Sequence, residues 1–349
     1  MATNDTTQGG SHGRPRLRVL ESFGPPRETT NPHSVLLLDA LRTSAHVDTF
    51  SWRRAVLGRY DVFHVHWPEV VVAKSTAVRR AAACVLLAVA LVGFRLRRTA
   101  VVRTAHNVSP HERQDALTRA VLRLTDRWTT WWVRLNDATV TPAGVPATTI
   151  PLGDYGDWYG RPSTPPQAGR MLFFGLIRPY KDVPALLEVF RGVPDTAARL
   201  VVAGRPSSSE VEADLRAAAA GDDRVELQLG HVADADLAAA IGAAQLVTLP
   251  YREMHNSGAV LLALTLGRPV LVPANPVTDA LAAEVGPWWL QRYDGDLTPD
   301  RLVEALAATS GEPPGPPDLS QRSWAHLADL YLGVFGRAVD RVHPRPTTG

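Results

Sequence analysis

The chain has 349 residues, 45% hydrophobic and 21% charged, which is enough for two domains with apolar cores and too apolar for wholesale disorder. Its single cysteine, Cys84, excludes an internal disulfide framework and a cysteine metal site. The net charge is +2, but residues 1–160 carry 20 basic against 13 acidic side chains and the remainder carry 17 against 22. The basic first half predicts an anionic partner, for which a membrane surface, a phosphorylated acceptor and a nucleic acid are the candidates.

Predicted elements of the first half alternate between strands and helices. Residues 1–15 are polar, are predicted to be a disordered tail and lack the apolar run of a secretory signal. Helices are predicted over 34–42 and 113–133, and short strands over 17–23, 45–52, 60–67, 100–108 and 136–144.

The second half repeats this alternation after a Gly- and Pro-rich linker at 151–169. Strands are predicted over 170–177, 198–204, 224–232, 245–251 and 269–274, with helices over 182–193, 208–220, 235–244 and 259–266. Such alternation predicts an α/β chain of two doubly wound, Rossmann-like domains, 16–150 and 170–317. A C-terminal segment, 318–349, is predicted to form a helix that crosses back to the first domain, followed by a tail.

One segment, 81–94, is a run of 14 uncharged residues that arginines bracket at 79, 80, 95, 97 and 98. A bilayer span needs about 20 apolar residues, so this run is too short to cross one. Two interpretations stay open: a buried core helix, and a helix lying in a membrane interface with arginines on the headgroups. The basic first half favours peripheral contact of residues 79–98 with the cytoplasmic face of the cell membrane.

The stretch FFGLIRPYKD, 173–182, places one of the chain's two lysines, Lys181, three residues after Arg178. An apolar strand pattern precedes Gly175, which permits a tight turn or the close approach of a ligand. The planar fork of an arginine and the compact charge of a lysine together suit a diphosphate. A pair of solvated surface charges is the alternative.

Two turns of the second half precede predicted helices. Asn256, Ser257 and Gly258 form a small polar turn that either binds an anion through backbone N–H groups or caps the helix. His231 and Val232 lie in a strand-to-helix turn. The sequence VVAGRP, after another strand, is not a Gly-x-Gly-x-x-Gly fingerprint, which disfavours a Rossmann dehydrogenase.

Strand ends in the first half carry titratable side chains that should open onto a cleft. His64 and His66 point the same way from one strand, as a metal pair or in one-sided packing, although no further Cys/His spacing supports a metal. Glu69 and His106 are candidates for a general base, with a helix cap and a satisfied histidine as the alternatives. Lesser candidates are the reserve bases Asp61 and Glu112, and the acceptor contacts Arg27, Asn31 and His33.

The stretches FFGLIRPYKDVPALLEVF, VVAGRP and LPYREMHNSGAVLLALTLGRPVLVP resemble the donor domain of GT-B glycosyltransferases. More narrowly they resemble the group 1 glycosyltransferases, whose pattern is G-x-[IL]-x-x-x-K-G, and the resemblance extends over residues 17–332. It implies two Rossmann-like domains facing across a cleft, the second binding a nucleotide sugar and the first an acceptor. It also implies that Arg178 and Lys181 hold the donor pyrophosphate and stabilise the departing charge.

The same resemblance implies further donor contacts. The 256–258 turn would meet the donor phosphate and sugar, the backbone at His231 and Val232 the nucleotide base, and Gly24 the phosphates. His106 would contact the donor sugar or act as the base that an inverting transfer needs.

A departure from the family pattern concerns stereochemistry. Many group 1 members carry Glu-x7-Glu around this turn, but Met254 and Leu262 occupy those positions here. The loss of both carboxylates argues against the usual retaining mechanism and favours inversion.

The NSG turn resembles, more loosely, β-mannosyltransferases that use GDP-mannose and a lipid-linked acceptor. The expected activity is hexosyl transfer, mannose from GDP-mannose in the first place, to a lipid-linked saccharide or glycan, with neither metal nor cofactor. The alternatives are a nucleotide-sugar epimerase and a non-catalytic nucleotide-sugar-binding protein. A nucleic-acid partner is disfavoured because no domain has a strong basic excess or a recognised binding module.

Overall fold

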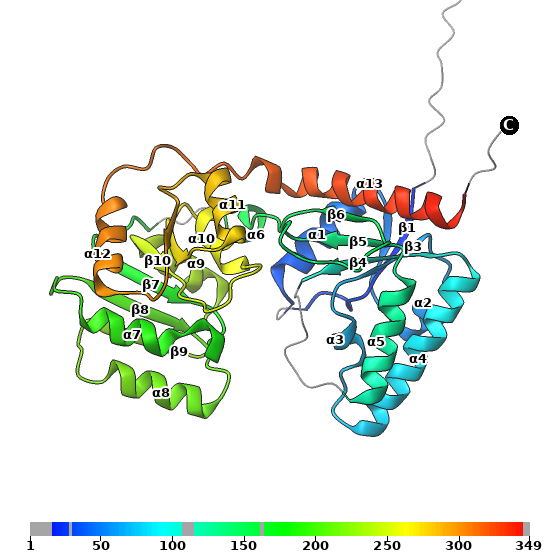
Figure 1. Cartoon of the computed structure of the whole chain (residues 1–349), viewed down its shortest axis with the longest axis horizontal. Helices are drawn as coiled ribbons and strands as arrows, with labels where there is room; N and C mark the ends of the chain where they lie inside the picture. The colour runs from blue at the N-terminus through cyan, green and yellow to red at the C-terminus, as the bar shows by residue number, and fades with distance from the viewer. Residues whose placement is uncertain (1–15, 28–29, 107–114, 161–163, 345–349) are drawn as a thin grey trace, which may run out of the picture.

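The computed structural model describes residues 16–27, 30–106, 115–160 and 164–344; the predicted tail at 1–15 and the reserve base Glu112 lie outside these ranges. Two six-stranded parallel sheets, each flanked by helices, lie next to each other (Figure 1). The expectation of two doubly wound α/β units is confirmed.

The first sheet has the strand order β2-β1-β3-β4-β5-β6. Its central strand β3 is buried throughout, as expected where helices cover both faces of a parallel sheet. The strands are β1 (Arg18–Glu21), β2 (His46–Asp48), β3 (Val62–Val65), β4 (Ala100–Ala105), β5 (Trp131–Arg134) and β6 (Ala147–Thr149). The helices are α1 (Pro32–Arg42), α2 (Trp52–Leu57), α3 (Pro68–Val72), α4 (Ala77–Leu96) and α5 (Ala116–Trp128), followed by the short α6 (Gly156–Tyr159).

The second sheet has the order β12-β11-β10-β7-β8-β9. Its strands are β7 (Arg170–Phe174), β8 (Arg199–Gly204), β9 (Val225–Leu229), β10 (Leu246–Thr248), β11 (Val270–Pro273) and β12 (Leu290–Tyr293). Its helices are η1 (Pro179–Lys181), α7 (Val183–Arg191), α8 (Ser209–Ala219), α9 (Asp234–Ala243), α10 (Gly258–Thr265), α11 (Pro276–Val285) and α12 (Pro299–Ala308). The chain ends with η2 (Ser320–Arg322) and α13 (Trp324–Val342).

Each sheet has a point where the strand order reverses. In the first sheet it lies between β1 and β3, and in the second between β7 and β10. Ligands of open α/β sheets bind outside the carboxyl ends of the strands at such points. The segments after β1, β3, β7 and β10 are therefore where a site is expected.

Helix α13 returns from the second sheet to the first (Figure 1). It packs on α1, β3 and β4, and its buried Tyr331 and Phe335 lie against the ring of His64. At its start, the Trp324 indole N–H donates to the Asp154 carbonyl over 2.8 Å, and Arg322 pairs with Glu284 of α11.

Two sequence expectations are wrong in the first half. The predicted strand at 136–144 is a turn followed by extended loop, and the predicted helix over 113–133 ends at Trp128. The residues after it, Trp131–Arg134, form β5, because two threonines and two tryptophans suit an extended chain better than a helix. The short β6 was not anticipated.

Two glycines set the spacing between β7 and β8. A Cβ atom added to Gly204, at the end of β8, would lie 2.0 Å from the Gly175 carbonyl oxygen. Gly175 itself has φ +100°, a conformation that favours glycine. This close approach fixes where the Gly175–Lys181 loop leaves the sheet.

We expect Gly204→Ala to lower the free energy of unfolding by about 1–3 kcal/mol, because a backbone carbonyl cannot move aside as a flexible side chain can. Urea titration followed by circular dichroism measures the change. Gly311→Ala is the matched control, because a Cβ there meets nothing within 4 Å. Equal stability of the two variants would contradict the packing described here.

Candidate active site

A buried carboxylate and three histidines form a hydrogen-bonded chain at the switch point of the first sheet. Glu21, the last residue of β1, has one oxygen 3.0 Å from His64 Nδ1 and the other 3.1 Å from His66 Nε2. The second nitrogen of His64 lies 2.8 Å from Thr104 Oγ1 on β4. His66 Nδ1 lies 2.9 Å from His106 Nε2, so the chain runs from β1 through β3 to the end of β4.

Protonation in this cluster follows from burial. Burial alone would raise the pKa of Glu21, but the adjacent His64 and His66 lower it to about 2, so the carboxyl is ionised at neutral pH. Burial and the neighbouring imidazoles lower the pKa of His66 to about 4 and that of His33 to about 3. The same causes hold the pKa of His106 well below its ordinary value. His33, His66 and His106 are therefore neutral at pH 7.

The ring of His106 sits between aromatic neighbours. It stacks on Trp67 with the ring centroids 4.0 Å apart, and the His33 ring approaches it edge-on at 5.8 Å. His33 is buried against Trp324, and neither of its ring nitrogens has a hydrogen-bond partner among the described residues.

Ring nitrogens of His33, His66 and His106 lie close enough to suggest a metal site. Two imidazoles on one tetrahedral zinc would hold their ligating nitrogens roughly 3.3 Å apart, given bonds of about 2.0–2.1 Å. The 2.9 Å separation of His66 and His106 is instead that of a hydrogen bond. His64 and His66 do point the same way, as predicted, but towards a shared carboxylate.

The predicted cationic pair lies at the switch point of the second sheet. Arg178 is exposed at the start of η1, whereas Lys181 is buried with its ammonium 4.7 Å from the centroid of the Tyr251 ring. A Cβ on Gly175 would lie 3.5 Å from that ammonium, so glycine leaves room beside it. Burial, reinforced by the charge of Arg178, lowers the pKa of Lys181 to about 8.

The loop after β10, residues 249–257, holds the cationic pair in place. The backbone N–H of Arg252 donates to the Tyr180 carbonyl over 2.9 Å, and its guanidinium binds both carboxylate oxygens of Asp182 at 2.7 and 2.8 Å. Asp182 has φ +53°, and this bidentate pair holds the turn that carries Lys181.

The same loop reaches the first half through Asn256. Its side-chain amide donates to the His106 carbonyl over 3.1 Å, and its oxygen accepts from the Asn136 amide over 2.8 Å. Lys181 and His106 are therefore attached to opposite ends of one short loop. Ser257 caps α10 by accepting from Val260 N–H, and a Cβ on Gly258 would collide with the Tyr155 hydroxyl.

A cavity of about 670 Å³ separates the two halves beside this loop. Residues 135–138 line it from the first half, and residues 254–257 with part of α11 line it from the second. Asn256 and Ser257 thus border the cavity, while Arg178 and Lys181 lie outside its lining.

The remaining predicted residues occupy different places. Gly24 is exposed after β1 and lines a cavity of about 390 Å³ with Trp67 and Lys74. His231 is exposed and Val232 half-buried in the turn between β9 and α9. Glu69 is half-buried in the first turn of α3.

Two of the lesser candidates have structural contacts. Asp61 lies at the amino-terminal end of β3, where its carboxylate accepts from the Arg18 backbone N–H. The cluster lies at the carboxyl ends of the strands, so the prediction of Asp61 as a reserve base is wrong. Asn31 caps α1 by accepting from His33 N–H.

Sequence reasoning missed Glu21 and Asn136. Glu21 ends an apolar strand, where an acidic residue breaks the pattern of its neighbours, and that break was a usable signal. Asn136 carried none, because its role depends on a partner 120 positions away.

The comparisons with known proteins agree with this geometry. Residues 168–309 match the family model described as glycosyl transferases group 1. Over 332 residues the chain is 41% identical to the GDP-mannose:glycolipid 4-beta-D-mannosyltransferase of Xanthomonas campestris pv. campestris, covering 94% of each chain.

Solved glycosyltransferase structures share the fold at low identity. Anabaena HepE with UDP-glucose has a TM-score of 0.58 at 12% identity, with 94% of this chain and 98% of that one covered. The catalytic domain of Arabidopsis thaliana starch synthase IV has a TM-score of 0.62 at 10% identity, with 93% and 99% covered. The chain belongs to the group 1 glycosyltransferases and has the GT-B fold.

Proposed function

We propose that this enzyme transfers mannose from GDP-mannose to a lipid-linked saccharide, with inversion, at the cytoplasmic face of the membrane. The proposal takes its donor and acceptor class from the relative that shares 41% identity over 94% of the chain. The observation that carries the chemistry is that one loop holds both the turn that carries Lys181, through the Arg252–Asp182 pair, and the backbone of His106, through Asn256. A donor clamp and an acceptor base need that proximity.

In this proposal Arg178 and Lys181 bind the GDP diphosphate and stabilise the charge that develops on it as the C1–O bond breaks. A lysine buried beside an arginine is costly without an anion, and a diphosphate supplies one. The N–H groups at the start of α10 and the backbone at Gly24, His231 and Val232 complete the donor site.

His106 is proposed as the base ahead of Glu69. It is neutral at pH 7 and belongs to a cluster that fixes its orientation. Burial lowers the pKa of Arg103, and the nearby negative charge of Glu69 partly offsets this decrease. Glu69 therefore serves as a charge partner in the first half and is proposed to contact the acceptor rather than to take its proton.

Membrane contact is proposed through α4 and α5. One face of α4 is buried in the core, while Val85, Val89 and Val92 on the other are 45–55% exposed. With Leu117 of α5 they line an apolar groove of about 430 Å³. By length and composition α4 could cross a bilayer, but the core helix of a soluble protein passes the same test, and α4 packs on α2, α3 and α5.

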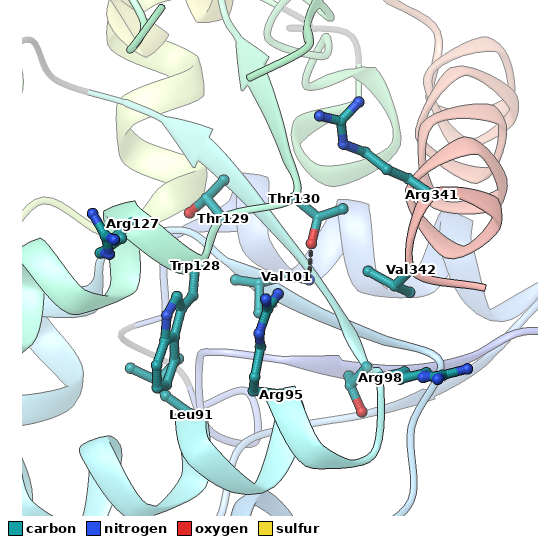
Figure 2. Close-up of a pocket in the computed structure, with 11 residues that line it drawn as sticks. Leu91, Arg95, Arg98, Val101, Arg127, Trp128, Thr129, Thr130, Arg341 and Val342 are labelled. Atoms are coloured by element: carbon teal, nitrogen blue, oxygen red, sulfur yellow. Dashed lines mark hydrogen bonds between the residues drawn. The ribbon is translucent and has the colours of Figure 1, made fainter. Parts of the chain in front are cut away.

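A second pocket, shown in Figure 2, is lined by arginines. Four arginines line a cavity of about 460 Å³ where α4, α5 and α13 end. The negative ends of three helix dipoles stabilise positive charge in this pocket. A cluster of arginines also attracts anionic lipid headgroups. The four residues are Arg95, Arg98, Arg127 and Arg341.

We expect Lys181→Ala to weaken GDP binding at pH 7 by about tenfold or more, because a charge-assisted contact to the diphosphate is lost. Isothermal titration calorimetry with GDP measures this, with Arg199→Ala as the charge-matched control, because Arg199 is exposed at the amino-terminal end of β8, whereas Lys181 follows the carboxyl end of β7. The wild-type affinity should also fall between pH 7 and 9, because Lys181 loses its proton near pH 8, and the variant should lack this fall. Unchanged GDP binding in Lys181→Ala would contradict the proposal that Lys181 binds the diphosphate.

The two base candidates are separated by His106→Gln and Glu69→Gln. We expect the first to slow transfer from radiolabelled GDP-mannose into a glycolipid extract by about 100-fold or more, and the second by less than tenfold. GDP affinity should change little in either. A larger loss in Glu69→Gln would reverse the assignment.

For the membrane surface, we expect Val89→Glu to lower partitioning onto anionic phosphatidylglycerol vesicles by about tenfold, because a charge replaces an exposed apolar side chain that is proposed to enter the lipid interface. Vesicle sedimentation measures the bound fraction. Val303→Glu, an exposed valine on α12, is the matched control. Equal partitioning of the two variants would place the membrane contact elsewhere.

A further inference from the structure

We propose that Glu21 and His66 form a positioning relay that sets which nitrogen of His106 takes the acceptor proton and that receives the resulting positive charge. This inference rests on the proposed function for the identity of the reaction. The contacts that carry it are those of Glu21, His66 and His106 alone.

The relay starts from the carboxylate, which can only accept hydrogen bonds when ionised. His66 must therefore carry its proton on Nε2, which faces Glu21 Oε2. A neutral imidazole has one proton, so His66 Nδ1 is an acceptor. His106 Nε2 lies 2.9 Å from that nitrogen and must donate to it.

The free lone pair of His106 then lies on Nδ1. No hydrogen bond among the residues that the structure describes uses this nitrogen. Stacking on Trp67 and the Asn256 bond to the His106 carbonyl restrain the ring and the backbone. A fixed tautomer with its lone pair on one known atom is what a general base requires.

The transfer step balances as follows. The acceptor O–H bond breaks and its proton joins His106 Nδ1, while the oxygen electron pair forms the new bond to C1 of the sugar. The C1–O bond to the β-phosphate breaks, and its electron pair leaves on GDP. The His106 Nε2 proton can pass to His66 Nδ1, which places the positive charge on the ring beside the Glu21 carboxylate.

His64 has a different part in this arrangement. Its Nδ1 faces the second oxygen of Glu21, and its Nε2 lies 2.8 Å from Thr104 Oγ1 on β4. It therefore helps to hold the carboxylate ionised and oriented without lying between Glu21 and His106.

Two measurements test the relay. In the wild-type protein, two-bond ¹⁵N–¹H NMR correlations should show His106 protonated on Nε2 and bare on Nδ1, a readout that needs no substrate. In Glu21→Gln, which keeps shape and removes charge, transfer into the glycolipid extract should slow by about 100-fold or more while GDP affinity stays within twofold. Asp222→Asn, a carboxylate that pairs with Arg224 far from the cluster, is the matched control and should leave both readouts unchanged.

A His106 protonated on Nδ1 in the wild type would overturn the relay, even if Glu21→Gln fails to fold. A transfer rate in folded Glu21→Gln within threefold of the wild type would also overturn it. Failure of the proposed function is a separate result: the wild type would then show the Nε2 tautomer but no mannosyl transfer.

Discussion

The buried, ionised carboxylate of Glu21 determines how the strands of the first sheet must align at their carboxyl ends. Glu21 has no contact with solvent and stays ionised only because two imidazoles donate to it. Those imidazoles come from the strand beside β1, so the carboxyl ends of β1 and β3 have to stay in register. His66 in turn hydrogen-bonds His106, which directly follows β4, so the end of β4 is held as well. A buried charge that is left unpaired costs several kcal/mol, so the loss of either imidazole would destabilise the fold around Glu21.

The second constraint is the loop after β10, which connects the two switch points. On one side it carries the ion pair between Arg252 and Asp182, and on the other the amide of Asn256. In the proposed reaction each sheet alone would offer half of a site: the second sheet a cation pair without a base, and the first a base without a cation pair. The loop after β10 contacts both switch points, which is the arrangement that the proposal needs.

The sequence was sufficient for the architecture of the second half and less so for the first. Strong apolar runs, each followed by glycine or proline, located β7, β8 and α7 closely, because local propensity and burial agree there. The stretch at 129–134 was predicted to continue the preceding helix although its threonines and tryptophans suit an extended chain, and in the structure Trp131–Arg134 pairs with β4. Lys181 was identifiable because the chain contains only two lysines.

The cluster at the first switch point could be predicted only in part. His64, His66 and His106 stood out as residue types at strand ends, but their partner Glu21 lies 43 positions before His64. Hydrogen bonds over such separations depend on which strands become neighbours, and composition and spacing do not give this. The same holds for Asn136 with Asn256.

The return of α13 to the first sheet has a consequence for the order in which the chain is made. Tyr331 and Phe335 complete the core against His64, yet they are synthesised after every strand of the second sheet. The first half therefore leaves the ribosome with an apolar face that stays uncovered until α13 has also been synthesised. Domains usually fold in the order of their synthesis, but here the second sheet can close its core first. A nascent chain halted before residue 324 would expose that face to chaperones.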